Sequence, residues 1–164
     1  MDRSTKTILL AGSIAGTLDI ISAFVLFGFK GVPPFRILQG IASGLLGKAA
    51  FAGGSGTALL GVVLHFLIAI SAAAVFYFAS RRIEFLIRHS VISGLLYGVL
   101  IYCFMNGVVL PLSAVFPRPD FTASGLISGM ILLMLLVGLP ISLVVSRAAL
   151  DFAPRRLTIN RSYS

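Results

Sequence analysis

The sequence predicts an all-α integral membrane protein with four transmembrane helices and one amphipathic interfacial helix between the first and the second. Of the 164 residues, 58% are hydrophobic and 11% are charged, and the mean hydropathy is +1.05. A soluble domain of this size needs more polar surface. Four apolar runs are long enough to cross about 30 Å of hydrocarbon at about 1.5 Å per helical residue. They span about residues 8–29, 57–78, 90–112 and 123–145.

The first run, residues 8–29, contains one ionisable side chain, Asp19, near its middle. A charged group at that depth costs several kcal/mol in lipid and normally faces protein or water. We therefore expect Asp19 to point into the bundle. The basic start of the chain is typical of a signal peptide, but the apolar run is too long and lacks a cleavage site of small residues, so we expect an uncleaved first helix.

The segment between the first two runs has a different pattern. Pro33 and Pro34 end the first helix, and apolar residues then recur at steps of three and four from Ile37 to Ala49. The polar residues of the segment fall on another face: Arg36, Gln39, Ser43 and Lys48. This periodicity predicts an amphipathic helix over about residues 35–50 at the membrane interface. A re-entrant half-helix is the alternative, and Arg36 and Lys48 favour the interfacial helix because they suit the level of the headgroups.

The distribution of basic residues predicts the orientation. Nine Lys and Arg lie in the N-terminus, the second loop and the C-terminus, against four in the first and third loops. The positive-inside rule then puts both termini in the cytoplasm. We expect one transmembrane domain over residues 1–153 and a tight hairpin at residues 116–120. The basic tail, residues 154–164, is expected to be disordered against anionic lipid rather than to bind nucleic acid.

Each apolar run carries small residues at helical spacing. The glycines that we expect at helix contacts are Gly12, Gly16, Gly61, Gly94, Gly98, Gly125 and Gly129. Small residues allow neighbouring backbones to approach closely in a membrane. The pattern predicts a compact four-helix bundle, with a kink at Pro140 in the last helix.

Four polar residues share the faces of these glycines: Asp19, His65, Tyr102 and Asn106. Counted from the outer helix ends, they lie roughly 15, 12, 15 and 9 Å deep, respectively. We therefore expect a polar cluster in the outer half of the bundle. Its role is open: the hydrogen bonds can fix helix register, with Asp19 protonated or paired with His65. Alternatively, the acid and the imidazole form a proton relay or a ligand site.

Other chemistry has little support in the sequence. His65 and His89 are the only histidines and Cys103 is the only cysteine, so we expect no metal site and no disulfide. The glycine-rich residues 53–56 lack the lysine of a phosphate-binding loop. No catalytic pair other than Asp19 and His65 is present, and we expect neither enzymatic activity nor a cofactor.

Four segments together resemble a known family. They are Ala15-Gly16-Thr17-Leu18-Asp19, residues 37–47 (ILQGIASGLLG), Leu64-His65-Phe66 and Gly94-Leu95-Leu96-Tyr97-Gly98. The combination resembles a family of small four-helix bacterial inner-membrane proteins of uncharacterised function, over about residues 8–146. A looser likeness, in layout but not in the aspartate, is to YagU-type inner-membrane proteins. The resemblance implies a bacterial inner membrane and four helices, and it implies no activity.

These features lead to two functional expectations. The first is a non-enzymatic structural or accessory membrane component, surrounded by the lipid bilayer and assembled as a homo-oligomer or in a larger membrane complex. The alternative is a small proton-coupled or cation-coupled permease or channel that uses Asp19 and His65.

Overall fold

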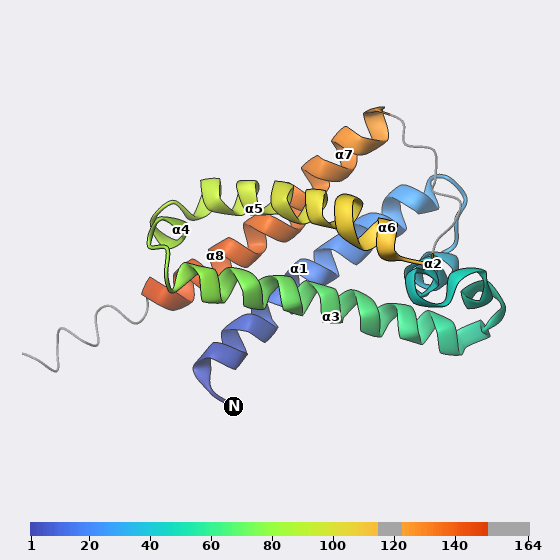
Figure 1. The fold of residues 1–164 in the computed structure, drawn as a ribbon, viewed down its shortest axis with the longest axis horizontal. Coiled ribbons are helices and arrows are strands. Elements are labelled where there is room, and N and C mark those ends of the chain that lie inside the picture. Colours follow the sequence, from blue (N-terminus) through green and yellow to red (C-terminus); the bar gives the residue numbers. More distant parts are fainter. Residues whose placement is uncertain (115–122, 151–164) are drawn as a thin grey trace, which may run out of the picture.

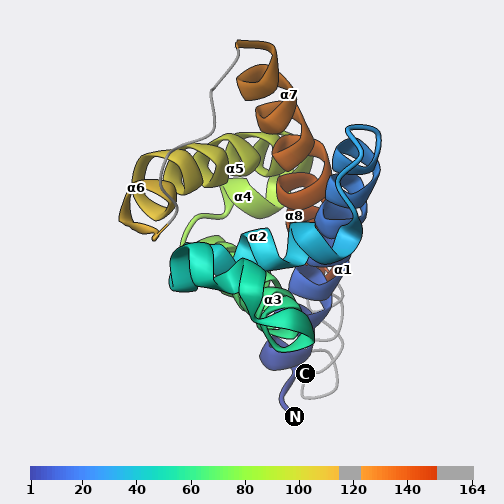
Figure 2. The ribbon, with the colours of Figure 1, turned by 90° about the vertical axis from the view of Figure 1, so that its right-hand side faces the viewer.

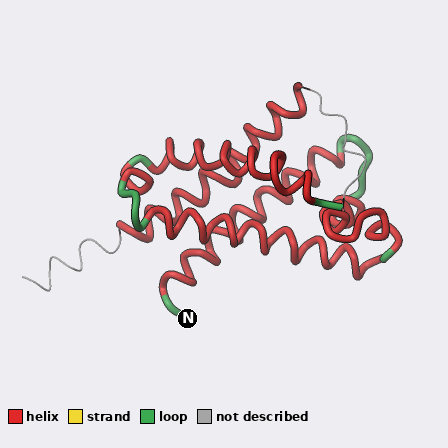
Figure 3. The backbone as a smooth tube through the Cα atoms, in the orientation of Figure 1, coloured by secondary structure: helices red, strands yellow, loops and turns green. Residues whose placement is uncertain are grey.

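The computed structural model describes residues 1–114 and 123–150. Within these ranges the regular structure is entirely helical (Figure 3). Four helical segments are long and apolar enough to cross a membrane: Arg3–Gly28, Gly54–Ser80, Ser90–Leu112 and Gly125–Leu150. The all-α class and the four long apolar helices are thereby confirmed. The hairpin predicted at residues 116–120 and the tail at residues 154–164 lie outside the described residues.

The first helix, α1 (Arg3–Gly28), begins earlier than the apolar run because Asp2 caps it. One carboxylate oxygen of Asp2 accepts a hydrogen bond from the backbone amide of Thr5 at 2.7 Å. This bond satisfies a backbone donor that has no partner inside the helix. The first helix therefore contains a polar turn that hydropathy alone does not detect.

The remaining elements follow in chain order. Helix α2 (Pro34–Leu46) continues into a 3₁₀ segment, η1 (Gly47–Ala52), and then α3 (Gly54–Ser80). A short helix, α4 (Phe85–Arg88), precedes α5 (Ser90–Phe104), which runs through a π-helical segment, η2 (Met105–Val109), into α6 (Leu110–Leu112). The fourth long helix consists of α7 (Ala123–Leu133), the π-helical η3 (Met134–Gly138) and α8 (Leu139–Leu150).

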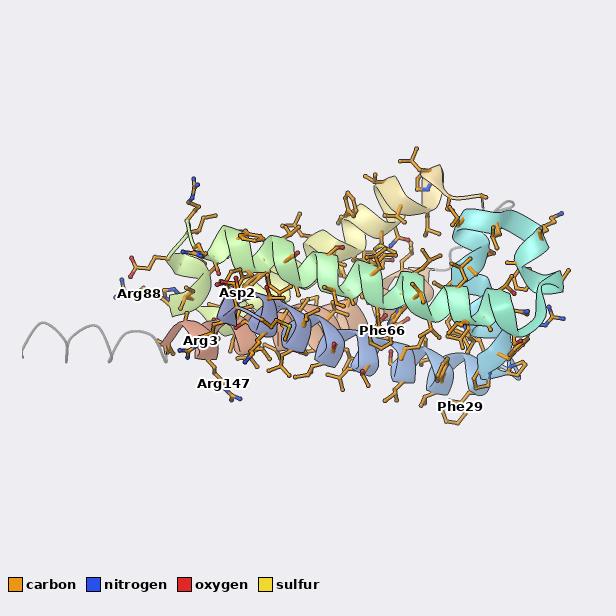
Figure 4. All side chains as sticks on the ribbon, turned by 90° about the horizontal axis from the view of Figure 1, so that it is seen from below. Asp2, Arg3, Phe29, Phe66, Arg88 and Arg147 are labelled. Atoms are coloured by element: carbon orange, nitrogen blue, oxygen red, sulfur yellow. The ribbon has the colours of Figure 1, made fainter. Side chains whose placement is uncertain are left out.

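The long helices form a bundle with two unlike ends. Helix α1 packs against α3 and α8, and α5 packs against α7, η3 and α8. Figure 1 shows the start of α5, α4 and the end of α8 on one side and α2 on the other. We call the first side the basic end, because it carries arginines that include Arg3, Arg88 and Arg147 (Figure 4), and the opposite side the α2 end.

The contact between α5 and the fourth helix is made through glycines. A Cβ atom on Gly98 would collide with the backbone of Met134, and one on Gly94 would meet Ser142 and the carbonyl oxygen of Gly138. Gly138 in turn lies against the backbone of Gly94 and Gly98. The closest contact of the fourth helix therefore runs through Gly138, which the sequence analysis did not select.

The two glycines predicted to pack in the fourth helix occupy other positions. Gly129 faces the ring of Tyr102, which would lie 3.3 Å from an added Cβ. Gly125 is exposed. The role of Gly125 in helix packing stays a prediction.

Two prolines each follow a π-helical turn. The amide of Leu139 donates to the carbonyl of Met134 just before Pro140, and the amide of Leu110 donates to the carbonyl of Met105 just before Pro111. A proline offers no amide and excludes the carbonyl four residues earlier, and a widened turn relieves that clash. The irregularity predicted near Pro140 is thus a π turn, and Pro111 has a second one.

Helix α2 lies across the α2 end of α3 rather than alongside it (Figures 1 and 2). Gln39 and Ser43, which the sequence places on the polar face of this helix, are only 1% and 5% exposed. The amide of Gln39 donates to the Gly54 carbonyl at 3.2 Å. The polar face of α2 is therefore turned toward the protein at Gln39 and Ser43, while Leu45 on α2 is 63% exposed.

Candidate functional site

The site is built on the contact between α1 and α3. Gly12 packs against the backbone of Ile70, and a Cβ on Gly16 would lie 3.1 Å from the ring of Phe66. Figure 4 shows Phe66 between the two helices. Because the glycines carry no side chain, the helices approach closely enough for side chains of α3 to reach the backbone of α1.

The imidazole of His65 makes such a contact. Its Nε2 atom lies 2.8 Å from the carbonyl oxygen of Gly16. A carbonyl oxygen only accepts, so Nε2 must carry the proton in this hydrogen bond. The Nδ1 atom is then the acceptor nitrogen of the ring.

Asp19 lies one helical turn after Gly16 and is half-buried, as is His65. The two groups are close enough for their charges to interact, although they do not form an ion pair within 4.0 Å. Over residues 1–114 and 123–150, the ion pair at that distance joins Arg88 and Glu84. No residue in these two ranges donates a hydrogen bond to the Asp19 carboxyl group. Within the described residues, this carboxyl group therefore lies near His65 without a hydrogen-bond partner.

Tyr102 and Asn106 form a separate pair. The side-chain amide of Asn106 donates to the backbone carbonyl of Tyr102 at 2.9 Å, within the same helical rod. The ring of Tyr102 faces Gly129 in α7. The structure therefore divides the predicted four-residue cluster into two pairs. The reason is that the face of α5 with Gly94 and Gly98 is turned toward the fourth helix rather than toward α1.

The structure also contains cross-helix hydrogen bonds that the sequence analysis did not include. The hydroxyl of Tyr97 donates to the Ala72 carbonyl at 2.7 Å. Ser142 donates to the Ser90 carbonyl at 2.8 Å. Tyr97 is adjacent to Gly98 in the sequence, so a polar residue flanking a predicted glycine contact is the signal that could have identified it.

Two hollows accompany these contacts. An apolar groove of about 560 Å³ lies near the α2 end, between α2, α3 and the α5–α6 rod, and its lining includes Gly40, Gly44, Leu64, Phe104 and Val108. A smaller hollow of about 270 Å³ lies at the basic end. Neither is lined by Asp19 or His65.

Asp19 and His65 bring a carboxyl group and an imidazole close to each other. The described chain contains no group of three or more His, Cys, Asp or Glu side chains that could hold a metal ion. Comparisons with protein-family models, with curated proteins and with solved structures give no match for this chain.

Proposed function

We propose that this protein is a non-enzymatic structural or accessory component of a membrane. The observation that supports this role is the use of polar side chains inside the long helices. Those of His65, Tyr97 and Ser142 each bond to a backbone carbonyl of another helix. Such bonds position helices, and groups engaged in them are not presented to a substrate.

A membrane location is supported by the large exposed apolar side chains. On α3, Leu59, Val63 and Leu67 recur every fourth residue and are 65%, 55% and 58% exposed. A stripe of this kind is suited to contact with lipid or with another membrane helix. The four long helices would then cross the bilayer, and α2 would lie at its surface with Arg36 and Lys48 at headgroup level.

The orientation and the type of membrane belong to the same proposal. The charge of the basic end favours a cytoplasmic location for both termini. The resemblance to small bacterial inner-membrane proteins favours a bacterial inner membrane. Placing α2 across the end of α3 is more consistent with an interfacial helix than with a re-entrant one.

The accessory role predicts assembly with itself or with another membrane protein. Cys103 is exposed on α5 beside Leu100 and Phe104, so it can report the approach of a second copy. Cross-linking in native membranes with a short bis-maleimide, followed by purification in mild detergent, should yield a homodimer or a stoichiometric complex. The Cys103→Ser variant is the control for the cross-link. Recovery of monomers alone by both methods would contradict the proposal.

A second candidate, a proton-coupled or cation-coupled permease, is favoured by one observation. The Asp19 carboxyl group receives no hydrogen bond from the described part of the chain and lies within electrostatic range of His65. In proteoliposomes, Asp19→Asn should abolish a pH-dependent flux without lowering the folded yield, whereas Asp2→Asn should leave the flux unchanged. Equal flux in the wild type and in Asp19→Asn would exclude this candidate.

A further inference from the structure

The hollow at the basic end lies where four elements meet. It is enclosed by the start of α1, the end of α3, the short α4 and the end of α8. Its polar lining residues are Arg3, Ser4, Thr7, Tyr77, Ser80 and Arg81. Ile87, Val145, Ala148 and Ala149 form its apolar wall. The hollow thus combines positive charge and hydroxyl groups with an apolar wall that belongs to the long helices.

Among the described residues, no carboxylate lines the hollow. Two acids of the described chain that are near the hollow in sequence have other contacts. Asp2 accepts a hydrogen bond from the amide of Thr5, and Glu84 lies 4.0 Å from Arg88. Arg81 is exposed, and the described chain offers it no ion pair. An anion can therefore approach the Arg81 guanidinium without displacing an acid from it.

Hydroxyl groups are already organised around this space. The hydroxyl of Tyr77 donates to Ser4 Oγ at 2.8 Å, which joins α3 to the start of α1. Ser80 donates to the backbone carbonyl of Tyr77 at 2.8 Å. The proton of Ser4 Oγ can still be donated to a ligand, since this hydroxyl acts as an acceptor toward Tyr77. Arginine and hydroxyl donors together are suited to phosphate oxygens.

Size and position favour a phosphate that is attached to a lipid. The hollow measures about 270 Å³, below the range of roughly 300–1,000 Å³ that is typical of sites for drug-sized ligands. It lies at the ends of helices long enough to cross a membrane, at the depth where headgroups are found. Basic pockets between transmembrane helices on the cytoplasmic side bind anionic headgroups, and the apolar wall gives the adjoining glycerol and acyl carbons a surface.

We propose that this hollow binds the phosphate of an anionic phospholipid, with Arg81 as the ion-pairing group and the Ser4–Tyr77 hydroxyl pair as hydrogen-bonding partner. The site is separate from Asp19 and His65, and it does not depend on the accessory role. The full chain in nanodiscs of phosphatidylcholine, titrated with phosphatidylglycerol, is the test system. Native mass spectrometry measures the lipid that stays bound.

The adjacent arginines provide a matched pair of variants. Arg81 lines the hollow and Arg82 does not, although both are exposed. We expect Arg81→Gln to weaken phosphatidylglycerol binding about fivefold or more, the order expected for one arginine near an anionic surface. Arg82→Gln should bind like the wild type. Equal losses in the two variants would overturn the proposal, because they would indicate a diffuse surface charge.

Two further measurements test the ligand class and the role of the hydroxyl groups. Inorganic phosphate at millimolar concentration should not displace the lipid, and displacement at lipid-like affinity would overturn the assignment to a phospholipid. Tyr77→Phe keeps the ring but removes the hydroxyl group, and it should weaken phosphatidylglycerol binding without changing phosphatidylcholine binding. Unchanged binding of both lipids in Tyr77→Phe and in Arg81→Gln would exclude the site.

Discussion

The two halves of the bundle are built differently. The half toward the basic end contains the buried core, in which Ala11 and Ala15 of α1 meet Ala73 and Phe76 of α3 and Ile141 of α8. The half toward the α2 end contains the apolar groove of about 560 Å³. All four long helices are strongly apolar along their length, so hydrophobicity does not explain the difference.

The surface that lies opposite each glycine explains it better. Gly94 and Gly98 face Gly138 across one contact, and Gly12 and Gly16 face Ile70 and Ala69 across another. Gly40 and Gly44 line the groove, where an added Cβ would meet no atom at Gly40 and only Ser113, at 3.9 Å, at Gly44. A glycine therefore brings helices together only where the opposite surface also allows a close approach.

The largest effect is expected at the α5 contact with the fourth helix. Gly98→Leu would place side-chain atoms on the backbone of Met134, which cannot withdraw as a flexible side chain can. We expect loss of the folded protein, measured by size-exclusion chromatography in detergent. Gly107→Leu in the same rod is the control, because a Cβ there has no neighbour within 4 Å. Similar yields of folded protein for the two variants would contradict the idea that a glycine contact depends on the opposite surface.

A smaller effect is expected where α2 meets α3. Gly61→Ala would place a methyl group against the carbonyl of Leu38, which should destabilise the docking of α2 by about 1–3 kcal/mol, the range typical of overpacking. Protease sensitivity of residues 34–52 is the measurement. Gly56→Ala has open space around its Cβ and should leave the cleavage rate unchanged. Equal cleavage of the two variants would show that Gly61 does not hold α2.

The hydrogen bonds between helices in the core should contribute less to stability than the glycine contacts. Tyr97→Phe removes the hydroxyl that bonds to Ala72, and we expect a loss of about 0.6–1.7 kcal/mol, as for other hydrogen bonds between membrane helices. Denaturation in mixed detergent micelles measures it. Tyr102→Phe is the matched control, since the described residues show no hydrogen bond from that hydroxyl. A larger loss of stability for Tyr102→Phe than for Tyr97→Phe would contradict the stabilising role of the Tyr97 hydrogen bond.

The smallest effect concerns the cap of α1 at the basic end. The hydrogen bond from the Thr5 amide holds the pKa of Asp2 below its usual value of 3.8. A lowered folded-state pKa means that the stabilisation is present above pH 4 and is lost as the pH falls through the folded-state value. Asp2→Ala should therefore melt slightly below the wild type at pH 7, and the two proteins should converge once the pH has fallen below the folded-state pKa. A constant difference across this range would contradict the assignment.

The sequence was sufficient to predict the four long apolar helices. Runs of apolar residues located the ends of the four long helices within a few residues, because hydropathy depends only on local composition. Asp19 and His65 were expected at similar depth, and the structure places them within electrostatic range. Counting residues from the helix ends gives the depth of a residue in the bundle, but it does not give the helix that the residue faces. For this reason it did not predict the neighbours of Tyr102 and Asn106.

The orientation of α2 could not be predicted for a related reason. Its periodicity separates an apolar stripe from a polar one, but an amphipathic helix near a membrane can turn either stripe toward the protein. Gln39 is buried because Gly54 and Thr57 offer hydrogen-bond partners, and that proximity exists only after the chain has folded back. Predicting the orientation of α2 required knowledge of tertiary contacts, which the local sequence does not contain.

The hydrogen bonds of Gln39 also imply an order of events during synthesis. The partners of its side chain, Gly54 and Thr57, emerge from the ribosome 15 and 18 residues later. Until they have been made, the amide has no place on α3 and must be hydrated. Docking of α2 through Gln39 therefore requires that the start of α3 has already been synthesised.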